Sequence, residues 1–471
     1  IGNLLLHLAA VFMLFWLFRE LGYSRNVSLI FSAIFAIHPA VTSAVTWVPG
    51  RTEAMLAILV ALSLILFMRF LRTADWRYLI GFLLFFAVAL FTKEVAIALL
   101  PVLFFYYLMH KEEKGGELMT TLASGLGVVS VAWFFVRKNI LADANVGDLS
   151  FLQMFSVFWS NSPAFLLYLG KAILPFNLTV LPVPENSTFI FGFAALAIVA
   201  VWGFFSKFKF SSLSALGLVW FVVFLAPSLV SYNFPENMVF FEHRLYLPLI
   251  GVLMFFMSTE YRVPSTEFWK KAISVFVMAV VVLFGILSFH YSGFYKNKKV
   301  FWQKAVADSP LSSEAHNGLA TAYLMDGKDE EALSEFTKVL ELNPEEKRVH
   351  LLLGLNYLDQ EMYNEAKTEF EKEIEIDPNQ FIAYQNLGRI YAQRKKFAEA
   401  ERNFLKALEI NPDYVLVHQD LAVFYFSQNK HPQAVMHIKE LFNRQTVESL
   451  NPQILKILEI YAKEVALKLS P

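Results

Sequence analysis

Cationic side chains stand at the ends of several apolar stretches, where a charge is costly unless it has a partner or a ligand. Arg51 follows a Pro-Gly pair, Lys93 precedes Glu94 between two apolar stretches, and His243-Arg244 opens another apolar stretch. Arginine can hold a phosphate through two parallel hydrogen bonds, and lysine acts on it as a point charge. If the fold brings these cations and His243 together, they would form a phosphate-binding site.

Glu53, Glu94 and His38 are the candidates for proton transfer, because carboxylates and imidazoles are common general bases. Each also has a simpler explanation. An acid beside a cation at a membrane edge is usually its ion-pair partner, which would join Glu53 to Arg51 and Glu94 to Lys93. A histidine before a proline at a helix end is as often a structural cap. The catalytic residue is therefore not identified by these patterns.

The sequence indicates no metal site. The chain has no cysteine, which excludes disulfides, thiolate chemistry and cysteine metal ligands. It shows no HxxxH pair or carboxylate cluster that would serve as a ligand set by itself. Whether a divalent cation takes part stays open.

The elements that would position these side chains are predicted to be membrane-spanning helices. The chain is 56% hydrophobic with a mean hydropathy of +0.47, and windows of about 17 to 25 apolar residues can cross a bilayer as helices. The predicted spans cover residues 3–18, 27–46, 54–71, 77–92, 95–109, 118–136, 188–205, 212–230, 245–259 and 268–290. A further apolar stretch, 151–174, contains Asn161, Pro163 and Lys171 and is expected to lie in the membrane interface.

Basic residues in short loops predict the orientation of these spans. If 151–174 does not span, most loop cations fall on one side, which is then cytoplasmic; they include Arg25, Arg72, Lys111, Lys207 and Arg262. This arrangement places the cationic candidates, and everything after residue 295, on the non-cytoplasmic side. It also makes the chain begin outside and within a helix, so we expect a preceding helix and outer loop to be missing. The formal net charge is only −1, which gives no indication of a nucleic-acid partner.

Residues 296–471 carry a repeat of about 34 residues, which is typical of tetratricopeptide units built from helix pairs. Its markers are Pro310, Pro344, Pro378 and Pro412, with leucine, tyrosine and alanine positions in register between them. A glycine or alanine follows each leucine and would let the two helices of a unit approach closely. The predicted units are about 313–346, 347–380, 381–414 and 415–448, followed by a capping helix over about 452–467.

These features together resemble one family. The chain has Ile1-Gly2-Asn3-Leu4-Leu5-Leu6-His7, a His38-Pro39 loop leading through Val45-Thr46-Trp47 to Gly50-Arg51, Lys93-Glu94, and Glu242-His243-Arg244-Leu245-Tyr246-Leu247-Pro248. Their order, with repeats after the last helix, is similar to the transmembrane and tetratricopeptide repeat-containing O-mannosyltransferases and their prokaryotic relatives. The resemblance implies an all-α protein: a GT-C transmembrane domain over 1–295 and a tetratricopeptide α-solenoid over 296–471.

The resemblance also implies an activity. Such an enzyme would move a sugar, mannose in the eukaryotic members, from a polyprenyl or dolichyl phosphate to a protein Ser or Thr hydroxyl. The repeats would hold the acceptor protein, and Arg244, His243, Arg51 and Lys93 would hold the lipid phosphate. The resemblance places the catalytic acids on a first outer loop, which we expect to be missing here, and Ser43 stands where relatives tend to have glutamate.

Other interpretations stay open. A membrane-anchored tetratricopeptide scaffold would use the same repeats without chemistry, and its charged loop residues would tolerate replacement. A transporter of lipid-linked sugars would need polar residues within the spans, where most runs are uninterrupted and apolar. A third interpretation is that the chain is an incomplete and inactive fragment.

Overall fold

The computed structural model describes residues 2–46, 50–110, 116–140, 151–176, 178–181, 188–205, 211–230, 242–258, 267–442 and 454–457. Every regular element within these ranges is a helix, which confirms the all-α prediction. The chain divides into two compact units, Ile1–Leu311 and Ser312–Pro471. Each is described below by itself.

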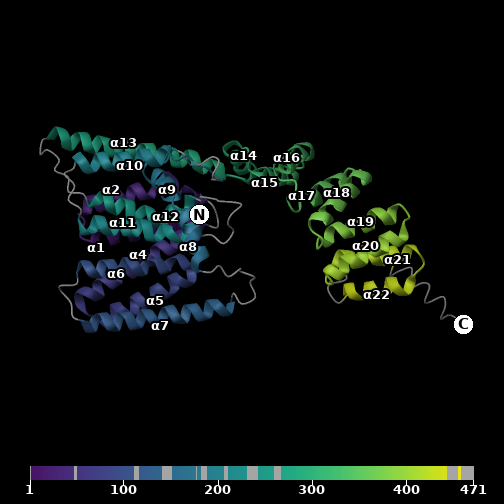
Figure 1. Cartoon of the computed structure of the whole chain (residues 1–471), viewed down its shortest axis with the longest axis horizontal. Coiled ribbons are helices and arrows are strands. Elements are labelled where there is room, and N and C mark those ends of the chain that lie inside the picture. The colour runs from purple at the N-terminus through teal and green to yellow at the C-terminus, as the bar shows by residue number, and fades with distance from the viewer. Residues whose placement is uncertain are drawn as a thin grey trace. The chain divides into compact units, whose positions relative to one another are not determined.

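The first unit is a bundle of apolar helices that run side by side (Figure 1). Each predicted window falls on one to three of its helices, and the stretch 151–174 breaks around Asn161–Pro163 into two short ones. The helices are α1 (Gly2–Glu20), α2 (Arg25–Ala36), η1 (Pro39–Val41), α3 (Thr42–Thr46), α4 (Arg51–Thr73), α5 (Trp76–Thr92), η3 (Glu94–Ala98), α6 (Leu99–Met109), α7 (Gly116–Ile140), α8 (Phe151–Ser160), α9 (Ala164–Ile173), α10 (Ile190–Phe205), α11 (Ser212–Leu225), η6 (Ala226–Leu229), η7 (Glu242–Leu245), α12 (Tyr246–Met257), α13 (Glu267–Ser292), η8 (Gly293–Tyr295) and α14 (Lys298–Asp308).

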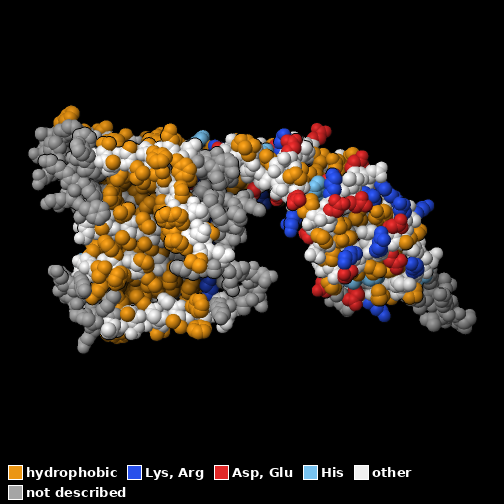
Figure 2. Space-filling view, in the orientation of Figure 1, with side chains coloured by type: hydrophobic (Ala, Val, Ile, Leu, Met, Phe, Trp, Pro, Cys, Tyr) orange, Lys and Arg blue, Asp and Glu red, His pale blue; other side chains and the backbone are white. Residues whose placement is uncertain are grey.

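Five of the described helices are long and apolar enough to cross a membrane, or six if α2 and its bent continuation count as one span. The bend of 54° lies between α2 and η1–α3, where Pro39 lacks the N–H that would continue the helix. Other apolar helices, such as α5 and α9, are shorter. Figure 2 shows hydrophobic side chains over much of the visible face of this unit. A surface this apolar is suited to lipid, so the first unit is a multi-pass membrane domain.

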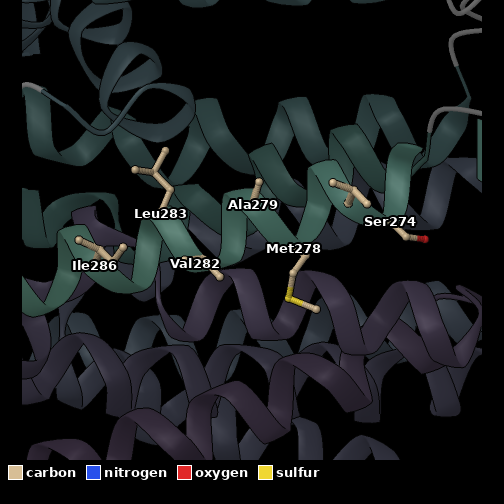
Figure 3. Close-up of a pocket in the computed structure, with 7 residues that line it drawn as sticks. Ser274, Met278, Ala279, Val282, Leu283 and Ile286 are labelled. Atoms are coloured by element: carbon tan, nitrogen blue, oxygen red, sulfur yellow. The ribbon is translucent and has the colours of Figure 1, made fainter. Parts of the chain in front are cut away.

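Helix α13 and helix α7 face outward more than the other long spans that the structure describes, with only 6% of the windows Ser274–Tyr295 and Thr120–Arg137 buried. A shallow groove of about 700 Å³ runs along α13 (Figure 3). The groove is lined by Ser274, Val275, Met278, Ala279, Val282, Leu283 and Ile286. Its wall is almost wholly apolar, so hydrocarbon chains of the bilayer would fit against it.

Helices α11 and α12 pack closely at a pair of glycines. A Cβ added to Gly217 would lie 2.6 Å from the carbonyl oxygen of Gly251, and one added to Gly251 would lie 2.4 Å from that of Gly217. Small residues let membrane helices approach in this way. The buried Trp220 also donates from Nε1 to the Leu247 carbonyl oxygen at 2.8 Å. These contacts fix α12, and with it the short helix η7 that precedes it.

The second unit is a solenoid of paired helices, which confirms the predicted tetratricopeptide repeats. Its described helices are α15 (Ser313–Met325), α16 (Asp329–Leu342), α17 (Val349–Asp359), α18 (Tyr363–Ile376), α19 (Phe381–Gln393), α20 (Phe397–Ile410), α21 (Val415–Ser427) and α22 (His431–Phe442). The predicted close approach within a unit occurs: a Cβ on Gly354 or Gly388 would lie 2.6 Å from the ring of Phe370 or Phe404. Of the predicted capping helix, residues 454–457 are described, and Ile454 and Ile457 pack against the last helix pair.

Candidate active site

The candidate residues gather at one end of the first unit, where four segments begin or end. These are the start of α4, the junction of α5 and η3, the short helix η7, and the turn η1–α3. Helix η7 contacts both η1 and α3, and α3 contacts α4. The bend after α2 and the short helices η3 and η7 therefore interrupt the apolar bundle here, so that polar side chains can be accommodated.

Glu53 and Lys93 form the central ion pair of this end. Lys93 Nζ donates a hydrogen bond to Glu53 Oε1, and the two side chains are 30% and 6% exposed. Lys93 is the extended C-cap residue of α5, whereas Glu53 lies in the first turn of α4, where the helix dipole favours an acid. Glu53 is thus held by a cation from another helix and not by its sequence neighbour Arg51.

Arg244 comes to the same carboxylate from η7. Its charge acts on Glu53, its Nη1 donates to the Ser228 carbonyl oxygen at 3.0 Å, and its guanidinium makes a polar contact with the hydroxyl of Tyr168. Two cations from distant segments, Lys93 and Arg244, therefore converge on one buried carboxylate. Both are among the predicted phosphate-binding residues, and that role stays a prediction.

His243 lies beside these cations but is not itself one. Burial, and then the charges of Lys93 and Arg244, together lower its pKa to about 3. Its imidazole is therefore neutral near pH 7 and can only donate or accept hydrogen bonds. It differs in this from Arg244, the next residue.

Three other candidates have different surroundings. Arg51 is exposed at the first position of α4, where the helix dipole disfavours a cation. Glu94 is 57% exposed and pairs with Arg137 of α7 at 3.2 Å. The two nitrogens of His38 both meet backbone groups: Nδ1 accepts from the Ala40 N–H at 3.2 Å, so Nε2 donates to the Ala172 carbonyl oxygen at 3.0 Å. Residues 47–49 of the same loop lie outside the described residues.

A second, fully buried ion pair adjoins the site. Lys171 Nζ of α9 lies 3.2 Å from Glu242 Oε1 of η7, and the two side chains are 7% and 6% exposed. The same oxygen accepts the backbone N–H of Thr179 at 2.7 Å. Our sequence interpretation did not assign this pair a role, although a lysine inside an apolar stretch was a signal for it.

A histidine and a tyrosine tie α1 to the start of α12. His7 Nε2 lies 2.9 Å from the Ala36 carbonyl oxygen, which can only accept. Nε2 therefore carries the proton, and Nδ1 accepts from the Tyr246 hydroxyl at 2.7 Å. Both residues belong to the motifs that carry the family resemblance, and here they fix the helix that follows η7.

No metal site accompanies these residues. In the described part of the chain, no group of three or more His, Asp or Glu side chains is placed to hold a metal ion. What the arrangement offers is a cationic site with a buried carboxylate, suited to an anion such as a phosphate.

Comparisons with known proteins agree with these observations. Residues 1–136 match the family model of dolichyl-phosphate-mannose-protein mannosyltransferases, and residues 313–346, 347–380 and 381–414 match tetratricopeptide repeat models. Protein O-mannosyl-transferase Tmtc1 of Drosophila melanogaster is 34% identical over 98 residues, which are 21% of this chain and 11% of that one. The match therefore spans about a tenth of the relative's length.

Among solved structures, the chain is similar to MamA from Desulfovibrio magneticus RS-1, with 21% identity and a TM-score of 0.29 over 30% of this chain and 81% of that one. It is also similar to pilF of Pseudomonas aeruginosa, with 23% identity and a TM-score of 0.32 over 35% of this chain and 76% of that one. Likenesses of this size carry no argument about function. The family matches show an N-terminal part similar to dolichyl-phosphate-mannose-protein mannosyltransferases, followed by tetratricopeptide repeats, as the resemblance predicts.

Proposed function

We propose that the first unit is a glycosyltransferase of the GT-C type, which moves mannose from a polyprenyl or dolichyl phosphate to a Ser or Thr hydroxyl of a protein. The observation that carries this proposal is the match of residues 1–136 to the mannosyltransferase family. That segment contains Arg51, Glu53 and Lys93, so part of the cationic cluster lies within it.

The charges of the cluster suit this chemistry. A lipid phosphate carrying a sugar is a diester with one negative charge, and loss of the sugar leaves a monoester whose charge approaches −2. Lys93 and Arg244 share the single carboxylate of Glu53, so they leave a surplus of positive charge. Preorganised positive charge stabilises the phosphate most in the transition state, where its charge is growing. The neutral His243 would add a hydrogen bond.

Transfer would take place on the non-cytoplasmic side. Helix α4 has 23 residues and is therefore about 35 Å long, close to the thickness of the hydrocarbon core. Arg51 begins it at the site, whereas Arg69 and Arg72 near its other end bind Glu20. Because the two ends of α4 are a membrane thickness apart, this arrangement supports a cytoplasmic end at Arg69 and Arg72 and a catalytic outer end at Arg51. The repeats would then present acceptor proteins on the outer side.

The experiment is transfer of radiolabelled mannose from a polyprenyl-phosphate mannose to membrane protein by the full-length gene product. We expect Arg244→Ala to lower transfer at least about 100-fold, because a lost electrostatic contact to the developing charge is costly. Arg77→Ala is the matched control, since Arg77 is 76% exposed and pairs with its near neighbour Asp75.

Three outcomes are distinct. Label that appears with the wild type and the Arg77 variant but not with Arg244→Ala supports the proposal. Equal label with the wild type and both variants would show that Arg244 is not part of the site. If no label appears while the repeats still capture protein partners, the chain is a membrane-anchored scaffold.

A further inference from the structure

The short helix α9 carries two buried polar side chains on one face. Tyr168 and Lys171 are three residues apart, which places them on neighbouring turns, and they are 1% and 6% exposed. Each contacts a different residue of η7: Lys171 pairs with Glu242 at 3.2 Å, and Tyr168 contacts the guanidinium of Arg244. Helix α9 therefore holds η7 at two points, on either side of His243.

Helix α9 is itself firmly placed. A Cβ on Gly170 would lie 2.7 Å from the backbone nitrogen of Gly192 in α10, so the two helices touch through their backbones. At the end of α9, the Ala172 carbonyl oxygen accepts a hydrogen bond from His38 Nε2 at 3.0 Å. The His-Pro turn and η7 thus rest on the same ten-residue helix.

The Lys171–Glu242 pair is more than a local contact. A lysine and a glutamate this deeply buried are tolerated only when each satisfies the other. Glu242 Oε1 also accepts the Thr179 N–H at 2.7 Å, so the carboxylate joins α9, the segment after it and η7. Together with the contact between Tyr168 and Arg244, these two contacts of Glu242 leave the backbone of residues 242–245 little freedom to turn.

We propose that Tyr168 and Lys171 are positioning residues for the lipid-phosphate site. Lys171 fixes η7 through Glu242, and Tyr168 orients the guanidinium of Arg244 toward the carboxylate of Glu53 and the phosphate that would lie there. This proposal rests on the proposed function. It assigns α9, from the apolar stretch that does not span in our predicted topology, the role of supporting the cation that contacts the donor.

The test is Tyr168→Phe in the full chain, because this variant removes one hydroxyl and keeps the packing. Two readouts are used: binding of polyprenyl phosphate to the purified protein in lipid nanodiscs, and transfer of mannose at varied donor concentration. We expect the donor KM and the Kd for polyprenyl phosphate to rise about tenfold with the acceptor KM unchanged, since misplacement of a binding group by a fraction of an ångström has effects of this size. Tyr23→Phe is the matched control: Tyr23 is also buried and hydrogen bonded, to Ser258 at the end of α12 farthest from η7.

A double-variant cycle separates positioning from general support. In an Arg244→Lys background, Tyr168→Phe should change the donor KM less than about twofold, because the group that it orients is gone. Lys171→Arg should keep most of the donor affinity, whereas Lys171→Met should lose it. If Tyr168→Phe changes the donor KM equally in the wild-type and Arg244→Lys backgrounds, the positioning role is wrong. It is also wrong if the Tyr168→Phe variant binds polyprenyl phosphate as tightly as the wild type does. If the wild type itself neither binds polyprenyl phosphate nor transfers mannose, the proposed function fails instead.

Discussion

Ion pairs in the two units are built differently. In the repeats, Lys338 and Glu341 lie three residues apart on one helix, and both side chains are 55% exposed. In the first unit, Lys171 and Glu242 are 71 residues apart and nearly inaccessible. Exposed pairs contribute little to stability, whereas a buried charge without its partner is strongly destabilising. The buried charges of the first unit therefore mark positions that its fold is built to hold, and the charges of the repeats mostly mark a solvated surface.

If this comparison is right, the stability of the repeats depends on their buried apolar side chains. Phe404→Ala should cost about 4 kcal/mol, the usual loss when a buried phenylalanine leaves a cavity. Phe404 is 1% exposed and packs against Gly388, so no side chain of that residue can fill the space. Hydrogen exchange of α19 and α20 in the full chain measures the loss as faster exchange.

The adjacent Leu405 is the control for this prediction. It is 47% exposed, so Leu405→Ala should leave exchange in both helices nearly unchanged. Similar exchange in the Phe404 and Leu405 variants would show that the repeats do not rest on their buried aromatic positions.

The stability of the first unit should instead depend on its buried ion pairs. Lys93→Met leaves the carboxylate of Glu53, which is 6% exposed, without its hydrogen-bonded cation, and should cost about 3 kcal/mol. The double variant Glu53→Gln/Lys93→Met leaves neither charge of this pair without its partner, so it should recover most of that loss. Unfolding of the purified protein in mild detergent measures both. Equal stability of the single and double variants would contradict the comparison.

The helices could be predicted from the sequence far better than these pairs. Apolar windows and the repeat period are local patterns, so each predicted window falls on a helix and each tetratricopeptide proline on a unit boundary. The pairs were expected between sequence neighbours, as Arg51 with Glu53 and Lys93 with Glu94. In the structure, Lys93 binds Glu53 and Arg137 binds Glu94.

The physical reason is that neighbouring side chains on a helix point in different directions. Lys93 is extended between α5 and η3, which turns its side chain back toward α4. The partner of Lys171 depends on how η7 packs on α9, and no local pattern records that packing. The cations could therefore be selected from the sequence, but their partners could not.

The repeats also contain buried ionisable side chains, and one pair of them should respond to pH. His316 and His350 pair with Glu335 and Glu369 at the same position of successive units, at 2.6 and 2.5 Å. The corresponding pair in the last unit joins His418 Nδ1 to His437 Nδ1 at 3.0 Å. Burial, and then the neighbouring His418, lower the pKa of His437 to about 4, and Glu440 opposes that shift.

Because this pKa is below the unfolded value of 6.5, the unfolded chain binds more protons between pH 6.5 and 4. Stability of the last unit is therefore complete above about pH 6.5 and falls as the pH is lowered through that window. We expect a loss of about 2 kcal/mol between pH 7 and 5. Hydrogen exchange of α21 and α22, corrected for the intrinsic rate at each pH, should show it, and His437→Gln should remove it. A loss of the same size in α17 and α18, where the partner is a carboxylate, would assign the effect to something other than the histidine pair.

The smallest effect is expected where both partners are solvated. Lys338→Ala, Glu341→Ala and the double variant should each change the stability of α16 by no more than about 0.5 kcal/mol, and the coupling between the two sites should be about 0.3 kcal/mol. Their nitrogen and oxygen are only 2.6 Å apart, so a short distance alone would suggest a strong interaction. Water and salt screen it, and ordering two flexible side chains offsets part of the gain. A double-variant cycle by hydrogen exchange at low and high salt tests this directly, and a coupling above about 1 kcal/mol that survives high salt would mean that exposure does not separate the charges of the two units.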